Sequence, residues 1–391
     1  MKKPKIIFLT SQVISERDFK RFGIYTIEAK SQLQIFDFTS IVQPRSFEKQ
    51  FKTRKKDLNI YFIKKLNQLS NLKSNFKDSD LIISLLGNQN ELNNCIFKFI
   101  KPYEKKVCLV NISATPIYPL DIKFSVLKRL YCGIFSERKF FFINKLRKII
   151  FIIKKIFSKR IYLKPGYLAS CGEEVINFFS DALHENTKII KTCSYDFVLS
   201  KLVKEKILDY KYMVFLDEYL INHSDLKILN RKIEKENIYY EELNKFFNFI
   251  EKNFKTKVVI ASHPRADLEF NKTKFPNHKV FKGITPQLMK YSEGCITHAS
   301  TSINFAVIFR KPILFITTNR MRRTRFNNEL LSSWFNKIPL NISKSYSYEE
   351  VFKSFKIDKI YMKKYFHKFI SFSEDTVFGF GPLIDSLKLN K

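Results

Sequence analysis

The chain has 391 residues, of which 45% are hydrophobic and 27% charged, and its formal net charge is +33 at pH 7. That length predicts two domains, and the hydrophobic fraction is sufficient for ordinary globular cores. No apolar run approaches the roughly 18 residues that a membrane-spanning helix needs. The apolar run at residues 6–9 is also too short for a signal peptide, so we expect a cytoplasmic protein.

The cysteines and the basic charge set further limits. Six cysteines without any CxxC spacing predict reduced, buried thiols rather than disulfides or a zinc site. The abundance of Lys, Ile, Asn and Phe is typical of an AT-rich genome, so much of the charge needs no functional explanation. The other interpretation is an anionic partner, either a membrane surface or a polyanionic substrate.

Strand and helix patterns alternate in the first half, which predicts βαβ units and a mostly parallel sheet. We expect helices at residues 16–30, with Ser15 as N-cap, and at 56–72. Residues 167–172 read as the last strand and turn of the first sheet, although a helix at 173–183 and a strand at 188–191 follow. The other expected strands lie at residues 5–10, 33–38, 80–86 and 106–112.

Residues 138–172 break this alternation, because they contain neither Asp nor Glu. Wound as a helix, the segment places Lys145, Lys148, Lys155 and Lys159 on one side and Phe, Leu and Ile residues opposite. A basic amphipathic helix suits the surface of an anionic bilayer, and the alternative is a helix packed on the sheet with a solvated basic edge. We expect residues 138–165 to bind the anionic inner-membrane surface.

The second half repeats the α/β alternation and predicts a second Rossmann-like domain. The expected division is a first domain at residues 1–195, a second domain at 196–345, and a helical tail at 346–391 that returns across both domains. A hinge is expected at 193–202, and Thr285 is expected to cap a helix before Pro286. The predicted strands are 212–216, 257–261, 279–281, 294–297 and 312–317, and the predicted helices are 239–254, 285–292 and 302–309.

Two clusters of His and hydroxyl residues follow predicted strands of this second half. The first is Ser262-His263-Pro264-Arg265, and the second runs from Thr297 through His298 to Ser300-Thr301-Ser302 at the start of an apolar helix. Ligands of parallel sheets bind at the carboxyl ends of strands, and helix N-termini bind anions, so a phosphate is the natural ligand. The plainer interpretations are N-capping for the hydroxyls and a surface turn for His263.

The sequence has an acidic pair after one predicted strand, and it lacks the usual metal-binding motifs. Asp217 and Glu218 follow the strand at 212–216, where a carboxylate that faces a cleft can act as general base toward a hydroxyl. The alternative is that the two residues are a helix-capping or solvated acid pair. No HExxH motif or clustered His/Cys set is present, and the Asp78-Ser79-Asp80 motif precedes its strand, away from the expected cleft. We therefore expect no metal.

The order of these motifs resembles that of bacterial GT-B glycosyltransferases, in particular the sialyltransferase, polysialyltransferase and capsule Kdo-transferase group. Those families share an acidic pair followed by Gly, then His-Pro, then a Ser/Thr-rich motif. Here the order is Asp217-Glu218, His263-Pro264 and Ser300-Thr301-Ser302, within a resemblance that covers about residues 212–318. Tyr219 stands where the family has Gly.

The resemblance implies that residues 1–195 form the acceptor-side domain and residues 196–345 the nucleotide-sugar-binding domain. It also implies that His263 contacts the departing nucleotide phosphate and that Ser300, Thr301 and Ser302 bind it. We expect the neighbouring residues Pro264, Arg265 and His298 to join this nucleotide site. The resemblance also implies that Asp217 or Glu218 serves the acceptor hydroxyl. Because Tyr219 departs from the pattern, Glu16 or Asp18 of the first domain is an alternative base.

The expected function is transfer of a sugar to a bacterial surface glycan, such as capsule or lipopolysaccharide, without metal or further cofactor. The donor of first choice is a CMP-linked nonulosonic acid or Kdo, with UDP- or GDP-sugars open, and the acceptor is a glycan or a lipid-linked glycan. One alternative is a CDP-polyol phosphotransferase of the teichoic-acid type. Another is a basic nucleic-acid-binding protein, which the spread of cations along the whole chain disfavours.

Overall fold

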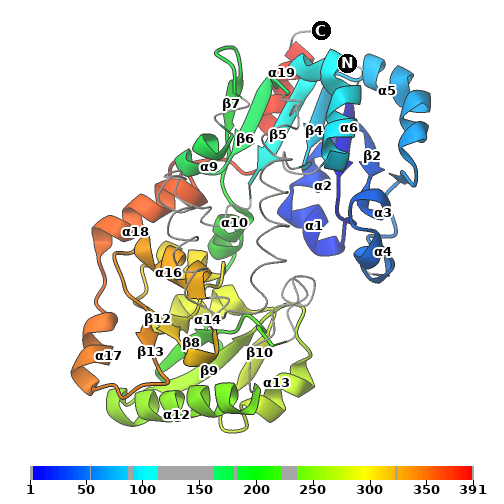
Figure 1. Cartoon of the computed structure of the whole chain (residues 1–391). Coiled ribbons are helices and arrows are strands. Elements are labelled where there is room, and N and C mark those ends of the chain that lie inside the picture. The colour runs from blue at the N-terminus through cyan, green and yellow to red at the C-terminus, as the bar shows by residue number, and fades with distance from the viewer. Residues whose placement is uncertain are drawn as a thin grey trace, which may run out of the picture.

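The computed structural model describes residues 3–52, 54–86, 91–112, 163–179, 183–221, 236–321 and 325–389. They form two parallel β-sheets with helices packed against them, arranged as two domains (Figure 1). The strand order is β3-β2-β1-β4-β5-β6-β7 in the first sheet and β10-β9-β8-β11-β12-β13 in the second. The expected α/β class with two Rossmann-like domains is confirmed.

Both faces of the first sheet are buried. Ile6 and Phe8 of β1 pack into one core, and the intervening Ile7 and Leu9 pack into the other. A strand buried on both faces has a continuous apolar sequence instead of an alternating one, as this strand does. The strands are β1 Lys5–Thr10, β2 Gln32–Asp37, β3 Ile60–Phe62, β4 Leu81–Ser84, β5 Val107–Asn111, β6 Tyr167–Ser170 and β7 Lys188–Lys191. The helices are α1 Glu16–Arg21, α2 Ile24–Lys30, α3 Thr39–Val42, α4 Pro44–Phe51, α5 Lys73–Asp78, α6 Glu91–Ile100 and α9 Glu173–Phe178, with 3₁₀ helices at Leu66–Leu72 and Lys101–Lys106.

The second sheet follows the same logic. Val214 and Leu216 of β8 face one core, and Met213 and Phe215 face the other. Its strands are β8 Tyr212–Leu216, β9 Lys257–Ser262, β10 Val280–Lys282, β11 Gly294–Thr297, β12 Ile313–Thr317 and β13 Leu340–Asn341. Its helices are α12 Glu236–Phe254, α13 Leu268–Lys274, α14 Thr285–Tyr291, α15 Ile303–Ile308 and α16 Arg325–Ser333, with a 3₁₀ helix at Asn319–Met321.

The tail returns from the second domain to the first, as expected. It contains α17 Tyr348–Ser354, α18 Lys359–Tyr365, a π-helical turn Phe366–Ile370 and α19 Gly381–Leu389, and α19 lies beside the first sheet (Figure 1). The turn packs tightly on the first domain, because a Cβ at Gly172 would lie 2.1 Å from the carbonyl oxygen of Lys368. Between the domains, α10 Tyr195–Lys201 occupies most of the expected hinge.

The structure corrects several local predictions. Residues 56–72 do not form one helix, since they contain β3 and a 3₁₀ helix. The helix expected at 16–30 is divided at Gly23, which has a φ of 63°. β6 is not the last strand of its sheet, because β7 pairs with it. Ile284 rather than Thr285 occupies the N-cap position of α14, and Cys95 is exposed rather than buried.

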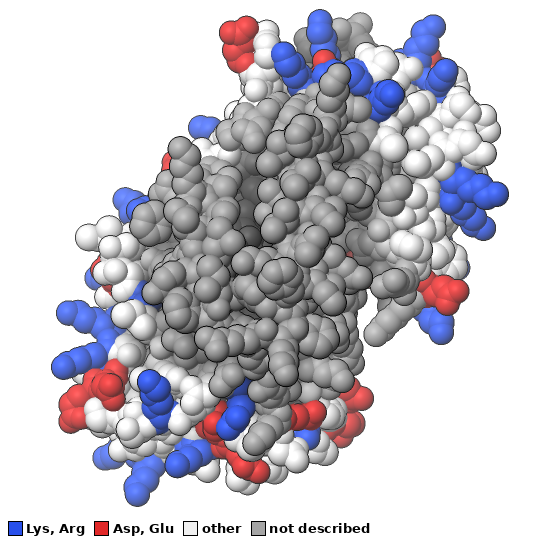
Figure 2. Space-filling model, viewed as in Figure 1, with Lys and Arg blue, Asp and Glu red and all other residues white. Residues whose placement is uncertain are grey.

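The expected basic amphipathic segment, residues 138–165, lies almost entirely outside the described residues. Among the helices that the structure describes, none combines the length and apolar character required to cross a bilayer. On the described surface visible in Figure 2, Lys and Arg side chains occur at both ends and along the edges of the molecule, and Asp and Glu side chains are interspersed among them. That visible surface shows no single basic patch.

Candidate active site at the domain cleft

Parallel pairing brings the ends of three strands together at one edge of the second sheet. Leu216 of β8 pairs with Ala261 of β9 on one side and with Thr297 of β11 on the other. The chain therefore leaves the sheet at neighbouring points, and the residues that follow form one wall of a cleft of about 530 Å³. The predicted site residues on this wall are Asp217, His263, Pro264, Ser300, Thr301 and Ser302.

His263 is half-buried on the cleft wall. Its Nδ1 accepts a hydrogen bond from the backbone N–H of Arg265 at 3.1 Å, across the turn that Pro264 begins. A nitrogen that accepts a hydrogen bond carries no proton in the neutral ring, so this contact favours the tautomer with the proton on Nε2. The imidazole is thereby prepared to donate from Nε2. Arg265 is exposed beside it.

The hydroxyl loop, which consists of Ser300, Thr301 and Ser302, is partly organised by its own hydrogen bonds. The N–H of Ser300 donates to Thr297 Oγ1 at 3.3 Å, and the N–H of Ser302 donates to Ser300 Oγ at 3.3 Å. Ser302 is the N-cap residue of α15, but its side chain makes no capping hydrogen bond. Helix capping by the Ser302 side chain therefore does not account for the three hydroxyl residues in this loop. All three residues of the loop line the cleft, as His263 does.

Asp217 is buried at the cleft wall and held from several directions. Its Oδ1 accepts from the N–H of Tyr219 at 2.9 Å, and its Oδ2 accepts from Asn271 Nδ2 at 2.7 Å. Asn271 also donates to Ser262 Oγ at 2.9 Å, so it links the two strand ends. Burial raises the pKa of Asp217, whereas hydrogen bonds from Tyr219, Asn271 and the backbone of His263 oppose that rise.

Glu218 faces the hydroxyl loop instead of the cleft lining. Its carboxylate accepts a hydrogen bond from the backbone N–H of Ala299, directly before Ser300. Burial raises its pKa to about 8, and the neighbouring charge of Asp217 adds to the rise, while the Ala299 hydrogen bond opposes it. The acid pair is thus divided, with Asp217 on the cleft and Glu218 supporting the loop.

Tyr219, which stands where the resembling families have Gly, has a φ of 52°. That left-handed backbone is the conformation that Gly adopts most readily. A Gly would therefore adopt the backbone conformation of this position without strain. The ring of Tyr219 packs against Phe270 with centroids 6.0 Å apart.

His298 is placed elsewhere than predicted. Its side chain is 0% exposed and does not line the cleft. Its Nδ1 forms a hydrogen bond with the carbonyl oxygen of Ile316 at 2.8 Å, and its Nε2 forms one with the hydroxyl of Tyr239 at 3.1 Å. Burial lowers the pKa of His298 to about 4. A neutral ring with both nitrogens engaged is a core residue, and it fixes the strand end from which the hydroxyl loop begins.

The opposite wall contributes residues that the sequence analysis did not identify. Arg17 and Arg21 of α1 line the cleft from the first domain, and Asp196 of α10 lies near both. Burial and the repulsion of Arg17 lower the pKa of Arg21, and the charges of Asp196 and Asp18 oppose this while Arg265 adds to it. One signal was available, because α1 follows the carboxyl end of β1, the edge where ligands bind.

Asp196 connects this wall to the hydroxyl loop. Its Oδ2 accepts from Asn304 Nδ2 at 2.8 Å, and Asn304 Oδ1 in turn accepts from the hydroxyl of Tyr365 at 3.1 Å. Asn304 lies in α15 and Tyr365 in the returning tail. A continuous chain of side-chain hydrogen bonds therefore joins α10, α15 and the tail.

The alternative bases of the first domain are occupied elsewhere. Glu16 pairs with Lys55 at 3.0 Å and with Lys20 at 3.7 Å. Asp18 accepts from Ser15 Oγ at 2.6 Å in a capping box, which confirms Ser15 as the N-cap of α1. Neither carboxylate lines the cleft, so the geometry favours Asp217 over both.

The described residues contain no group of three or more His, Cys, Asp or Glu side chains placed to hold a metal ion. The cleft instead offers an imidazole, hydroxyls and arginines. These are groups that bind an anion by hydrogen bonds and charge.

No protein-family model matches the sequence, and no curated protein matches it either. Solved structures do match across the whole length. The H444N variant of the wall teichoic acid polymerase TagF aligns with 100% of this chain and 90% of that chain, at 12% identity and a TM-score of 0.51. The fold is GT-B.

Two further structures align at lower scores. MurG from Acinetobacter baumannii covers 99% of this chain and 100% of its own, at 8% identity and a TM-score of 0.46. UDP-GlcNAc 2-epimerase from Neisseria meningitidis, bound to UDP-GlcNAc, covers 100% of both chains at 14% identity and a TM-score of 0.46. At such identities the shared feature is the fold.

Proposed function

We propose that this protein is a glycosyltransferase that uses a nucleotide-activated sugar to extend a bacterial surface glycan. The observation that carries the proposal is the convergence of His263, the hydroxyl loop Ser300-Thr301-Ser302 and Asp217 on one cleft. These groups come from three separate loops, and the fold that positions them is GT-B. An anion-binding wall beside a carboxylate, between two Rossmann-like domains, suits transfer from a nucleotide donor.

The proposed step breaks the bond between the anomeric carbon and the donor phosphate, and it forms a bond from that carbon to an acceptor oxygen. The bond electrons leave with the phosphate, whose charge is met by the Nε2 proton of His263 and the hydroxyl loop. Asp217 takes the proton of the acceptor hydroxyl. Its burial favours this role because a raised pKa improves a carboxylate as a base.

The finer assignment follows the motif order. We propose a CMP-linked nonulosonic acid or Kdo as donor, with UDP- and GDP-sugars as the other options. Pro264 would border the nucleotide, and Arg17 and Arg21 would add positive charge from the first domain. Arg265, which is exposed and is not among the described residues that line the cleft, would approach the nucleotide from the rim. The acceptor would be a glycan or lipid-linked glycan at the inner membrane surface, with residues 138–165 as the proposed contact.

A second candidate is polyol-phosphate transfer from a CDP-polyol. It is retained because the wall teichoic acid polymerase TagF shares this fold over the whole chain. The two reactions differ in product, since sugar transfer makes a glycosidic bond and polyol transfer makes a phosphodiester. Nuclear magnetic resonance of the ³¹P nucleus in the purified product separates them.

Nucleotide binding is tested first by a thermal-shift screen of the purified protein against CMP, CDP, UDP and GDP. A ligand that binds only the folded state stabilises it by mass action and so raises the melting temperature. At a ligand concentration one hundred times Kd, the free energy of unfolding increases by about 2.7 kcal/mol. We expect CMP or CDP to give the largest shift. If none of the four nucleotides shifts the melting temperature, the proposed function fails.

His263 is tested by His263→Ala with the nucleotide donor that the screen selects. Loss of a proton donor at the leaving phosphate should lower turnover by about 10²- to 10⁴-fold. The fold should be retained because the side chain is half-buried at a turn. His184→Ala is the matched control, since His184 Nδ1 accepts from the N–H two residues ahead in the same way, at 3.4 Å, on an exposed turn. Full turnover in His263→Ala removes the residue from the mechanism.

A further inference from the structure

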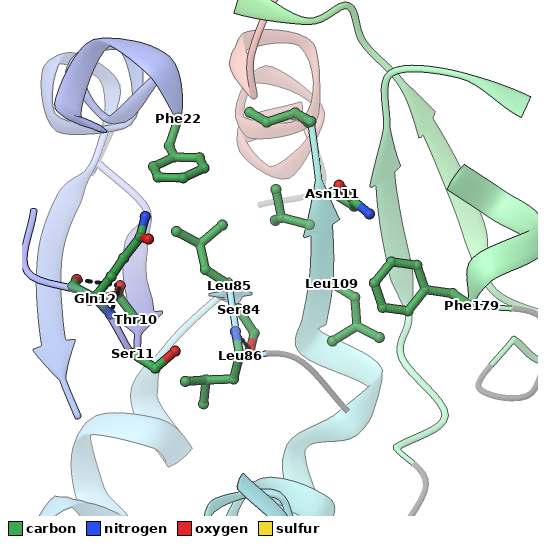
Figure 3. A pocket seen from close by; sticks show the side chains of 12 residues that line it. Thr10, Ser11, Gln12, Phe22, Ser84, Leu85, Leu86, Leu109, Asn111 and Phe179 are labelled. Atoms are coloured by element: carbon green, nitrogen blue, oxygen red, sulfur yellow. Dashed lines mark hydrogen bonds between the residues drawn. The ribbon is translucent and has the colours of Figure 1, made fainter. Parts of the chain in front are cut away.

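The first domain contains a second pocket, of about 270 Å³, at the carboxyl ends of β1, β4 and β5 (Figure 3). Phe22 and Phe179 enter it from opposite sides, and Leu85, Leu86 and Leu109 lie between them. Polar side chains stand among these apolar ones. Ligands of parallel sheets bind at this edge, so the position alone makes the pocket a candidate subsite.

The part of the pocket lining that the structure describes carries no charged side chain. None of the twelve described residues that line it is Lys, Arg, Asp, Glu or His. Charged residues make up 27% of the sequence and the net charge is +33, so a lining drawn at random would include about three charges. In a chain this basic, the uncharged described lining disfavours an anionic ligand, because none of these twelve side chains would pair with a carboxylate or phosphate.

The polar groups in the pocket suit a neutral partner. Among the described residues, the half-buried side chains of Ser11, Gln12 and Asn111 make no hydrogen bond to other parts of the chain. Thr10 is already engaged, because its Oγ1 donates to the carbonyl of Gln12 at 2.7 Å and accepts from its N–H at 3.1 Å. Thr10 thus fixes the loop that presents the Gln12 amide, which can both donate and accept.

The pocket adjoins the cleft of the proposed active site. Ile112 lines both cavities. Arg21 lines the cleft while the next residue, Phe22, lines the pocket. A group held in the pocket would therefore lie next to the space assigned to the donor.

We propose that this pocket binds an uncharged sugar unit of the acceptor. A pyranose has hydroxyls around its rim and C–H groups on its faces, which matches amides and hydroxyls set among aromatic and aliphatic side chains. The inference rests on the proposed function and makes it more specific: the acceptor unit next to the reacting hydroxyl carries no carboxylate or phosphate.

The test is saturation-transfer nuclear magnetic resonance on the full-length protein with matched methyl glycosides. The neutral probes are the methyl glycosides of glucose, galactose, mannose and N-acetylglucosamine, and the acidic probes are the methyl uronides of glucose and galactose. We expect at least one neutral glycoside to bind about tenfold more tightly than the uronides, since an unpaired carboxylate in an uncharged pocket is costly. Gln12→Ala and Asn111→Ala should each weaken that binding about fivefold or more.

Two controls assign the signal to the pocket. Asn277→Ala removes an exposed amide on the second domain and should leave glycoside binding unchanged. Gln12→Lys adds a cation to the pocket and should shift the preference toward the uronide. Circular dichroism confirms that each variant is folded.

The inference is overturned if no neutral glycoside binds, if the uronides bind more tightly, or if the Gln12 and Asn111 variants bind like the wild type. These outcomes leave the nucleotide shift untouched, so they are separate from failure of the proposed function. Conversely, if a glycoside binds but no nucleotide shifts the melting temperature, the proposed transferase function fails, and the pocket binds a sugar for another purpose.

Discussion

Glu218 lies in a buried environment that its sequence context does not predict. Its carboxylate supports the hydroxyl loop through the N–H of Ala299, yet burial raises its pKa from 4.5 to about 8. Between those two values, the folded protein holds a proton at this site that the unfolded chain has released. The free energy of unfolding therefore falls as pH rises through that window.

Glu218→Gln should remove this dependence, because the amide keeps an oxygen for Ala299 and has no proton to lose. Relative to the wild type, the variant should gain about 1–3 kcal/mol in unfolding free energy between pH 5 and pH 8, since one pKa unit corresponds to about 1.4 kcal/mol. Urea unfolding at both pH values measures it, with the exposed Glu205→Gln as control. Parallel pH dependence in all three proteins would contradict the assignment.

At this scale, position after a strand predicted which residues lie at the cleft better than residue type did. Asp217 and His263 could be placed because each directly follows an apolar strand, and parallel pairing then brings the strand ends together. His298 has the same sequence position, but its ring turns into the core to bond Ile316 and Tyr239. Side-chain direction after the last strand residue depends on tertiary packing, which the local pattern does not contain.

Among the elements, α19 has the clearest structural role. Ile384 is 0% exposed and packs, together with Phe380 and Leu383, in a core of the first domain. This helix is the last element of the tail, which leaves the second domain and returns to the first. Its neighbour Asp385 pairs with Lys30 of α2 at 2.6 Å at a partly exposed position. The contribution of this helix to the first domain should therefore come from burial more than from charge.

Ile384→Ala should destabilise the first domain by about 2–4 kcal/mol through lost burial and a residual cavity. Asp385→Ala, one position later, should cost less than about 1 kcal/mol, as exposed ion pairs do. Hydrogen exchange provides the measurement, because amides of β1 and β2 should exchange faster in Ile384→Ala and nearly normally in Asp385→Ala. Equal effects of the two substitutions would show that α19 is held mainly by the ion pair.

Element prediction succeeded where burial is continuous and failed where it is intermittent. The strands at 5–10 and 212–216 match β1 and β8 because each is an unbroken apolar run between polar residues. At 56–72, Leu58, Ile63 and Leu69 have helical spacing, but they do not share a helix. Leu58 precedes β3, Ile63 follows it, and Leu69 lies in the 3₁₀ helix, although all three are buried. A short edge strand such as β3 leaves too little pattern in the sequence to compete with that spacing.

At the scale of the molecule, both domains contribute to one cleft. The polar chain from Asp196 through Asn304 to Tyr365 joins α10, the second domain and the tail, and Asp196 interacts electrostatically with Arg17 and Arg21 of the first domain. Local sequence around α1 specifies how that helix packs on its own sheet. The position of α1 after β1 indicates the ligand-binding edge of the first sheet, but it carries no information on the surface of a second domain some two hundred residues later in the chain. That signal alone therefore did not single out these two arginines as residues that face the second domain.

This arrangement predicts that the first domain contributes to nucleotide affinity. Arg17→Ala combined with Arg21→Ala should raise the Kd for the best nucleotide about tenfold, or about 1.4 kcal/mol, because two cations facing the phosphate are lost. Lys20→Ala is the matched control, since Lys20 lies on the same helix with the same charge but is exposed beside Glu16 and outside the cleft lining. Isothermal titration calorimetry at two salt concentrations measures both, and the salt dependence should weaken in the double variant alone. Equal affinities in the double variant, the control and the wild type would mean that the nucleotide is held by the second domain without help from the first.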